Sequence, residues 1–140
     1  MKKTVRAIII EDNKLLVFFR RKLVDNKYIT YYAIPGGHVE DNETLEETVI
    51  RELKEEMNLD IEIIRYLGEI EAYNQTEYYY YAKIVGGVLQ FGGEELERNN
   101  KDNYYEISWL DIDIAMNSNI TAIDMIKKVV SEYEDGYIFK

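Results

Sequence analysis

The chain has 140 residues, of which 46% are hydrophobic and 31% charged, and its 27 acidic residues against 17 Lys and Arg give a formal net charge of −10. This length and apolar content predict a single domain, residues 1–140, able to bury roughly 68% of its unfolded surface. The acidity excludes a protein that grips nucleic acid or an anionic membrane through phosphates, because both need a basic surface. An acidic protein that handles phosphates needs a cation as intermediary.

Two features of the sequence indicate the compartment. The chain contains no Cys, which excludes disulfides and thiolate chemistry and fits a reducing cytosol. The apolar run 7–10 is interrupted by Glu11 and Asp12, so it is far too short for a signal-peptide core or a membrane span. We therefore expect a cytoplasmic protein without a membrane anchor.

Three strands are predicted before the first helix. Residues 4–10 and 15–20 are apolar runs joined by the polar turn 11–14, which is the pattern of a hairpin. Residues 28–34 are rich in aromatic and β-branched side chains, and Pro35 ends the strand that they predict.

The clearest helix follows these strands. Residues 44–47 have the S/T-x-x-E form of a capping box, and the run to Met57 contains no Gly or Pro. At about 100° per residue, one apolar stripe is expected to face the core and contains Val49, Ile50, Leu53 and Met57. The neighbouring flank carries three acids, Glu52, Glu55 and Glu56. Asn58 then stands where helices often end in a left-handed residue.

The second half of the chain predicts further strands and another helix. Strands are expected over residues 61–73, 77–85 and 105–110, and an amphipathic helix is expected to open at residues 118–119. Tyr78 to Tyr81 predict a strand that buries alternate rings and exposes the others. Stacking of these rings on a base or ribose is the less common alternative. Trp109 is expected in the core. The order of these predicted elements, strands, helix, strands and helix, indicates an α+β fold with a mixed β-sheet.

The three acids on one helical flank indicate a metal site, although a Glu-rich helix face is more often simply solvated. Like charges four residues apart, such as Glu52 and Glu56, destabilise a helix by roughly 0.2–0.5 kcal/mol unless something neutralises them. The hard cations Mg²⁺ and Mn²⁺ take carboxylate oxygens together with substrate phosphates and water. The flank alone does not decide between these readings.

The spacing of the fixed residues around the flank is much more specific. Gly37 is followed by five residues and Glu43, then by seven residues and the run Arg51-Glu52-Leu53-Lys54-Glu55-Glu56-Met57-Asn58-Leu59. This resembles the 23-residue Nudix box of the Nudix hydrolases, G-x5-E-x7-R-E-U-x-E-E-x-G-U, where U is aliphatic. Asn58 replaces the last Gly, the one departure among the fixed positions. Pro35-Gly36 matches the usual lead-in.

The resemblance implies a Nudix-type αβα sandwich and hydrolysis of a nucleoside diphosphate linked to another moiety. It implies that Glu52, Glu55 and Glu56 bind Mg²⁺ or Mn²⁺, helped by the main-chain carbonyl of Gly37. It also implies that Glu43 and Arg51 form the ion pair that holds the loop against the helix. Which of the three glutamates is the general base stays open, because family members differ in the base that they use.

Residues outside the box are candidates for the rest of the site. Arg20 and Arg21 end a strand beside the expected site, so either is a candidate phosphate clamp next to Gly36 and Gly37, and a solvated strand end is the equal alternative. Among the acids after the box, Glu97 and Glu106 are favoured as one further metal ligand, although such charges usually face solvent. His38 is expected to form a hydrogen bond in the loop.

The substrate is left open by the sequence. ADP-ribose hydrolases of the family commonly carry a Pro after the box, and this chain has none beyond Pro35. Dinucleoside polyphosphate hydrolases often carry a Tyr there, and Tyr73 and Tyr78 bracket the place without occupying it. Nucleoside triphosphates and nucleotide sugars are equally compatible. Family members are often homodimers, but no specific interface signal is visible.

Two other functions compete with hydrolysis. A nucleotide-sensing module with the same fold typically loses box carboxylates, and all of them are present here. An isoprenoid-diphosphate isomerase usually relies on a Cys, which this chain lacks.

Overall fold

A computed structural model describes residues 2–72, 74–90, 100–118, 120 and 122–134. Its strands and helices are, in chain order, β1 (Lys2–Ile8), β2 (Ile10–Glu11), β3 (Lys14–Val24), β4 (Lys27–Ala33), β5 (Gly36–His38), α1 (Leu45–Met57), β6 (Leu59–Ala72), β7 (Gln75–Gly87), β8 (Asn103–Asp111), α3 (Ile112–Met116) and α4 (Ile123–Glu134).

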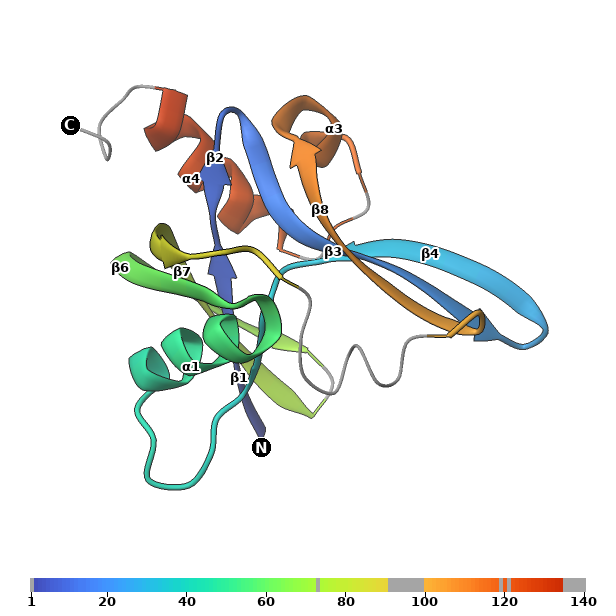
Figure 1. Cartoon of the computed structure of the whole chain (residues 1–140), viewed down its shortest axis with the longest axis horizontal. Helices are drawn as coiled ribbons and strands as arrows, with labels where there is room; N and C mark the ends of the chain where they lie inside the picture. Colours follow the sequence, from blue (N-terminus) through green and yellow to red (C-terminus); the bar gives the residue numbers. More distant parts are fainter. Residues whose placement is uncertain (1, 73, 91–99, 119, 121, 135–140) are drawn as a thin grey trace.

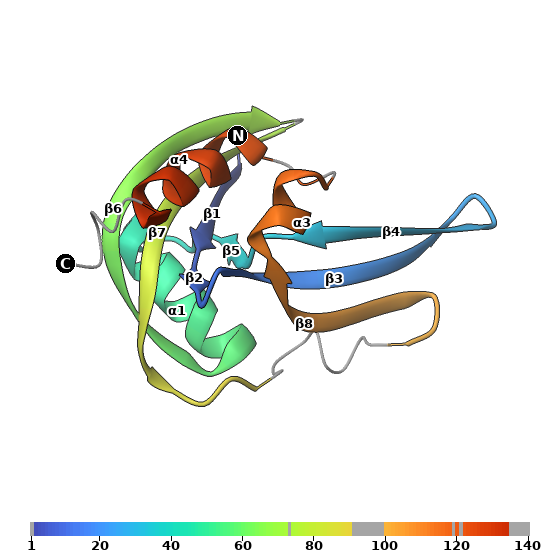
Figure 2. The same cartoon turned by 90° about the horizontal axis from the view of Figure 1, so that it is seen from above.

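The strands form two sheets with helices on both sides. One sheet has the order β5-β1-β7-β6 and is mixed, because β1 and β7 run parallel while the other pairs are antiparallel. In the second sheet β3 pairs with β2, β4 and β8. Figures 1 and 2 show α1 and α4 on opposite sides of the first sheet, and β3, β4 and β8 projecting from the body as an arm. The predicted α+β class is confirmed.

The chain passes from the first sheet to the second at Ile9. The expected single strand over residues 4–10 is therefore split into β1 and β2. Ile8 and Ile10 face the core cluster that includes α4, whereas Ile9 faces the cluster that includes α1, so all three side chains are buried. The following turn has positive φ at Asp12 (51°) and Asn13 (61°), as a two-residue hairpin turn requires. The predicted hairpin is thus confirmed.

Helix α1 begins and ends as its sequence predicts. Thr44 is the N-cap and forms the capping box with Glu47, and Asn58 is the C-cap in the left-handed conformation with φ 57°. Val49, Leu53 and Met57 are buried, but the expectation for Ile50 is wrong, since Ile50 is 44% exposed. The buried face of the helix instead includes Thr48 and Glu56. The Thr48 hydroxyl donates to the Glu43 carboxylate, and the Glu56 carboxylate accepts from the Gly36 amide.

The second half differs from expectation in two places. The rings of Tyr79, Tyr80 and Tyr81 are all buried, so the expected alternate exposure is wrong: helices cover both faces of this central strand. The last helix begins at Ile123 rather than near residue 118, after the short helix α3 and a left-handed Ala122 with φ 70°. Trp109 packs, half-buried, against the cluster under α1.

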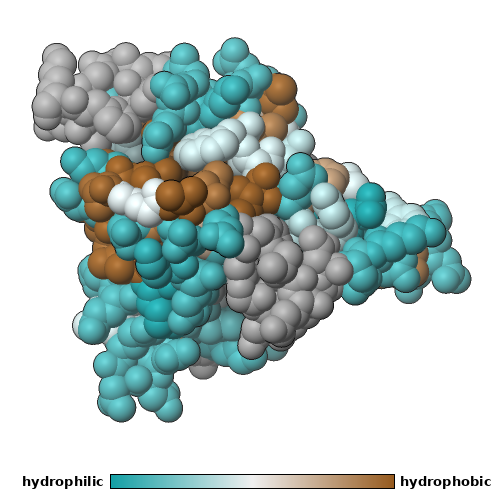
Figure 3. All heavy atoms as spheres, viewed as in Figure 1, coloured by the Kyte–Doolittle hydropathy of each residue, from teal (hydrophilic) through white to brown (hydrophobic). Residues whose placement is uncertain are grey.

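The surface shown in Figure 3 is hydrophilic over α1 and over the tip of the arm, with a hydrophobic band near the ends of β6 and β7. Val85 and Val88 are exposed by 56% and 74% in this part of the chain. Within the described ranges, none of the helices has the length and apolar character needed to span a bilayer.

The C-cap of α1 provides a test of the fold. Replacing Asn58 with Ala should lower the free energy of unfolding by about 1–2 kcal/mol, because an Ala side chain is strained in the left-handed conformation. Asn58→Gly is the matched control: it also loses the hydrogen bond from Asn58 Nδ2 to the Val88 carbonyl but keeps the backbone relaxed. Urea unfolding measures both variants, and an equal loss in Ala and Gly would contradict the backbone explanation.

Candidate active site

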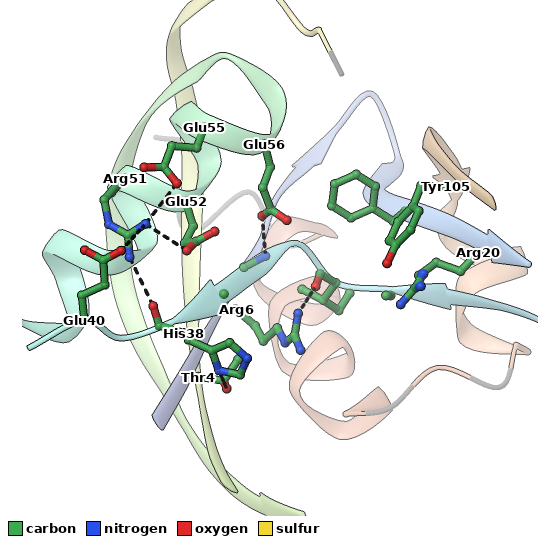
Figure 4. Close-up of a pocket in the computed structure, with 15 residues that line it drawn as sticks. Thr4, Arg6, Arg20, His38, Glu40, Arg51, Glu52, Glu55, Glu56 and Tyr105 are labelled. Carbon is green, nitrogen blue, oxygen red and sulfur yellow. Dashed lines mark hydrogen bonds and ion pairs between the residues drawn. The ribbon is translucent and has the colours of Figure 1, made fainter. Parts of the chain in front are cut away.

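A pocket of about 680 Å³ lies between α1, β5 and the base of the arm (Figure 4). This volume is in the range of small-molecule sites. Six elements and the residues beside them line it in the described part of the chain: α1 with Arg51, Glu52, Glu55 and Glu56; the β5 region with Gly36, Gly37, His38 and Glu40; β4 and the residue after it with Ala33 and Ile34; β1 with Thr4 and Arg6; β3 with Phe18 and Arg20; and β8 with Tyr105. The glutamates of the predicted metal flank and the two glycines before them therefore share one cavity.

The guanidinium of Arg51 organises the acidic wall of this pocket. Its Nε and Nη2 donate to the two carboxylate oxygens of Glu43 at 2.7 and 3.0 Å, a bidentate pair. Its Nη1 donates to Glu52 at 3.0 Å and to Glu55 at 3.1 Å, and Nη2 also donates to the His38 carbonyl at 3.2 Å. One side chain thus joins the loop after β5 to two carboxylates of α1.

The Glu43–Arg51 pair stays ionised. Hydrogen bonds from Arg51 and then from the Thr48 hydroxyl lower the pKa of Glu43 from 4.5 to about 2. The same pair raises the pKa of Arg51 further above its usual value. Glu43 is therefore ionised and paired with Arg51 over the whole physiological pH range.

Gly36 and Gly37 allow the close approach of backbone and carboxylates. The amide of Gly36 donates to Glu56 Oε1 at 3.2 Å. A Cβ on Gly36 would lie 1.8 Å from the Val5 carbonyl oxygen, and a Cβ on Gly37 would lie 2.3 Å from the carboxyl carbon of Glu52. Gly36 has no room for a side chain, because its Cβ would meet the backbone of β1, whereas a side chain at Gly37 would have to displace the Glu52 carboxylate.

The three carboxylates of the flank differ in their exposure. Glu56 is 7% exposed as a residue, whereas the side chains of Glu52 and Glu55 are 16% and 58% exposed. This order follows the angular positions of the residues around the helix axis, since Glu56 is nearest to the buried face and Glu55 is nearest to solvent. The flank therefore runs from the floor of the pocket to its rim.

The donor set of this wall fits a hard divalent cation. It consists of carboxylate oxygens from one helix, with the backbone of Gly37 against Glu52. Within the described part of the chain, no three acidic or imidazole side chains stand close enough together to hold an ion as they are. Glu52 and Glu55 are bound to Arg51, so a cation has to compete with Arg51 for both of them.

The wall opposite the α1 carboxylates carries two arginines (Figure 4). Arg6 donates from Nη1 to the Ile34 carbonyl at 3.1 Å and pairs with Glu77 at 3.3 Å. Arg20 lies 3.8 Å above the centre of the Tyr105 ring and donates to Asn103 at 3.0 Å. An acidic wall thus faces a basic wall across one cavity, which suits an anionic ligand held together with a cation.

The structure brings Arg20, but not Arg21 or Glu106, to this pocket. Arg21 lies on the other face of β3, near Tyr104, and donates to the Lys101 carbonyl. Glu106 stands opposite Phe19 in the register and accepts a hydrogen bond from Tyr104. Side chains alternate between the two faces of a strand, so Arg20 and its neighbours cannot all face one cavity.

Two predicted candidates remain, His38 and Glu97. His38 Nδ1 lies 3.2 Å from the Thr4 hydroxyl oxygen, as expected of a hydrogen-bonding residue. Glu97 lies outside the described residues.

Seven of the described residues that line the pocket were not predicted from the sequence: Thr4, Arg6, Phe18, Ala33, Ile34, Glu40 and Tyr105. A signal was present for two of them. Thr4 and Arg6 alternate with the buried apolar residues Val5 and Ala7 in β1, so they interrupt an otherwise apolar strand on one face. Phe18 and Tyr105 resemble ordinary strand residues, and the pairing of β3 with β8 that brings them together is not visible in the sequence.

The lowered pKa of Glu43 predicts a pH dependence of stability in the metal-free protein. A carboxyl whose folded pKa lies below its unfolded value stabilises the fold above the unfolded pKa, and this contribution is lost as the pH falls towards the folded pKa. Glu43→Gln should therefore be less stable than the wild type at pH 6, and the gap should close between about pH 5 and pH 2. Urea unfolding in chelator across this range measures it. A gap independent of pH would contradict the ionised pair.

Comparisons with known proteins identify the family of this chain. A family model described as the NUDIX domain matches residues 1–129. The chain is 33% identical over 99 residues to the ADP-ribose pyrophosphatase of Methanocaldococcus jannaschii, an alignment that covers 66% of this chain and 57% of that protein. It is 35% identical over 57 residues to the 8-oxo-dGTP diphosphatase of Proteus vulgaris, covering 41% of this chain and 51% of the relative. The alignments thus span little more than half of the length of these relatives.

The fold also resembles solved structures. The solution structure of the E. coli ORF135 protein matches with a TM-score of 0.66 at 20% identity, and the match covers 95% of this chain and 91% of that one. At this identity the likeness concerns the fold alone, and it supports the sandwich implied by the box. Because the family model matches residues 1–129 and the residues of the box line the pocket, this chain belongs to the Nudix hydrolase family.

Proposed function

We propose that this protein is a divalent-metal-dependent pyrophosphohydrolase that cleaves the phosphoanhydride of a small nucleoside diphosphate derivative, such as a nucleoside triphosphate or a nucleotide sugar. The observation that carries the proposal is the arrangement of Glu52, Glu55 and Glu56 on one wall of a pocket whose other wall carries Arg6 and Arg20. The names of the two relatives, a pyrophosphatase and a diphosphatase, support the class of reaction.

The residues that would hold Mg²⁺ or Mn²⁺ are Glu52, Glu55 and Glu56, with the carbonyl of Gly37. Such a cation neutralises phosphate charge and lowers the pKa of bound water. Among these glutamates, a carboxylate that is not fully engaged as a ligand takes the proton of the attacking water. Water then adds to one phosphorus while the bridging P–O bond breaks, which leaves two phosphorylated products.

The other pocket residues position the substrate and the carboxylates. Arg20 binds non-bridging phosphate oxygens, because a guanidinium matches phosphate geometry. Arg51 stays on Glu43 through the bidentate pair and keeps the loop after β5 against α1. Its bonds to Glu52 and Glu55 hold these side chains in the pocket before the cation arrives.

Substitutions on the flank test the catalytic role. Glu52→Gln, Glu55→Gln and Glu56→Gln should each reduce hydrolysis by about 10²-fold or more, because each removes a charge that the cation or the proton transfer needs. Glu46→Gln is the control: it makes the same change on the same helix outside the pocket, where the side chain accepts from the Tyr80 hydroxyl. Product release is measured with Mg²⁺ on nucleoside triphosphates, ADP-ribose, dinucleoside polyphosphates and nucleotide sugars. Equal turnover by the wild type and all three flank variants would contradict the assignment, and binding without turnover of any substrate would favour a sensing module.

Metal binding is tested without turnover. Mg²⁺ or Mn²⁺ at 100 times its dissociation constant should stabilise the folded protein by about 2.7 kcal/mol. Thermal unfolding of chelator-treated protein should therefore shift upward with metal in the wild type, and much less in Glu56→Gln. An identical shift in both proteins would place the cation elsewhere.

A further inference from the structure

A second cavity, of about 140 Å³, adjoins the active-site pocket and shares Arg6, Ala33 and Ile34 with it. Its other lining residues are Tyr31, Tyr32, Glu77, Tyr79 and Ile120. The volume suits a single ring system rather than a whole nucleotide. A ligand whose phosphates lie in the main pocket therefore has a place for one further group beside Arg6.

Glu77 supplies a buried hydrogen-bond acceptor in this cavity. It is 6% exposed, and its Oε2 accepts from Arg6 at 3.3 Å and from Gln75 at 3.2 Å. Its Oε1 accepts from the Tyr79 hydroxyl at 2.9 Å, and burial together with Glu77 raises the pKa of Tyr79, so this hydroxyl stays a donor. A carboxylate has about four acceptor positions, and these three bonds to described residues leave room for one more.

Arg6 supplies donors beside that acceptor. Its guanidinium has five N–H groups, and two of them are engaged with Ile34 and Glu77 among the described residues. The charge pair with Glu77 holds the guanidinium at the junction of the two cavities. A donor edge and an acceptor edge therefore stand side by side, in a cavity whose lining also includes residues of β4.

We propose that this cavity is the base-recognition subsite of the enzyme, and that Arg6 and Glu77 select a nucleobase that carries both a carbonyl and an amino group on one edge. The inference rests on the proposed function, since it assumes that the phosphates occupy the adjoining pocket. Guanine and cytosine have such an edge: Arg pairs with the guanine carbonyl, and an acidic side chain accepts from the cytosine amino group. Adenine lacks the carbonyl, and uracil lacks the amino group.

Binding of the four nucleoside monophosphates GMP, CMP, AMP and UMP tests this proposal by titration calorimetry on the wild-type protein. We expect GMP or CMP to bind at least about tenfold more tightly than both AMP and UMP, since one good pair of this kind discriminates by that factor or more. Glu77→Gln should lose this preference, because its amide presents a donor as well as an acceptor. Glu69→Gln, the same change at an exposed position of β6, should keep it.

A second variant, Arg6→Lys, keeps the outcome decisive. Arg6→Lys keeps the charge but loses the planar donor edge, so it should also reduce the preference, and it replaces Glu77→Gln if circular dichroism shows that variant unfolded. A merely structural Arg6–Glu77 pair would leave the ratio of affinities unchanged in both variants. Equal binding of the four nucleotides by the wild type, no binding of any of them, or a preference that survives both substitutions would overturn the subsite.

Hydrolysis of GTP, CTP, ATP and UTP with Mg²⁺ separates this proposal from the proposed function. Turnover without base preference overturns the subsite and leaves the function standing. Base preference in binding without any turnover supports the subsite and contradicts hydrolysis.

Discussion

The bonds of Arg51 to Glu43, Glu52 and Glu55 are the interaction on which the rest of the site depends. Without a cation, these carboxylates repel one another on one face of a helix and its preceding loop. Arg51 removes this repulsion unequally: it binds Glu43 through two nitrogens and shares the third between Glu52 and Glu55. The loop is therefore held by a bidentate pair, while Glu52 and Glu55 share one nitrogen and, in the proposed function, would exchange it for a cation.

This arrangement explains where the charge of the chain is concentrated. Residues 37–60 contain nine acidic and two basic residues and so hold seven of the ten net negative charges. The strands of the opposite wall instead contribute Arg6 and Arg20 to the pocket. In the proposed function, phosphates would meet the arginine-bearing wall on one side and a cation on the other, so an acidic protein could handle an anionic substrate without a basic surface.

The local parts of this site were predictable from sequence, and the parts built by strand pairing were not. Thr44, Asn58 and the carboxylate flank follow from helix capping and helical periodicity, which act within a few residues. The positions of Arg6, Tyr105 and Glu106 depend on which strands pair and on which face of the sheet each side chain lies. The register of these strand pairs cannot be read from local sequence patterns. Ile50 is exposed, and the buried face of α1 instead includes Thr48 and Glu56, whose hydrogen bonds to Glu43 and Gly36 are contacts that helical periodicity does not show.

A crystal structure with Mn²⁺ and a non-hydrolysable nucleotide, with the metal located by anomalous scattering, tests most directly whether the α1 carboxylates hold a cation. We expect a peak within coordination distance of the Gly37 carbonyl and at least two of Glu52, Glu55 and Glu56, with Arg51 still bound to Glu43 and released from at least one of Glu52 and Glu55. A manganese peak away from α1, or an ordered nucleotide in the pocket with no metal beside these glutamates, would contradict it.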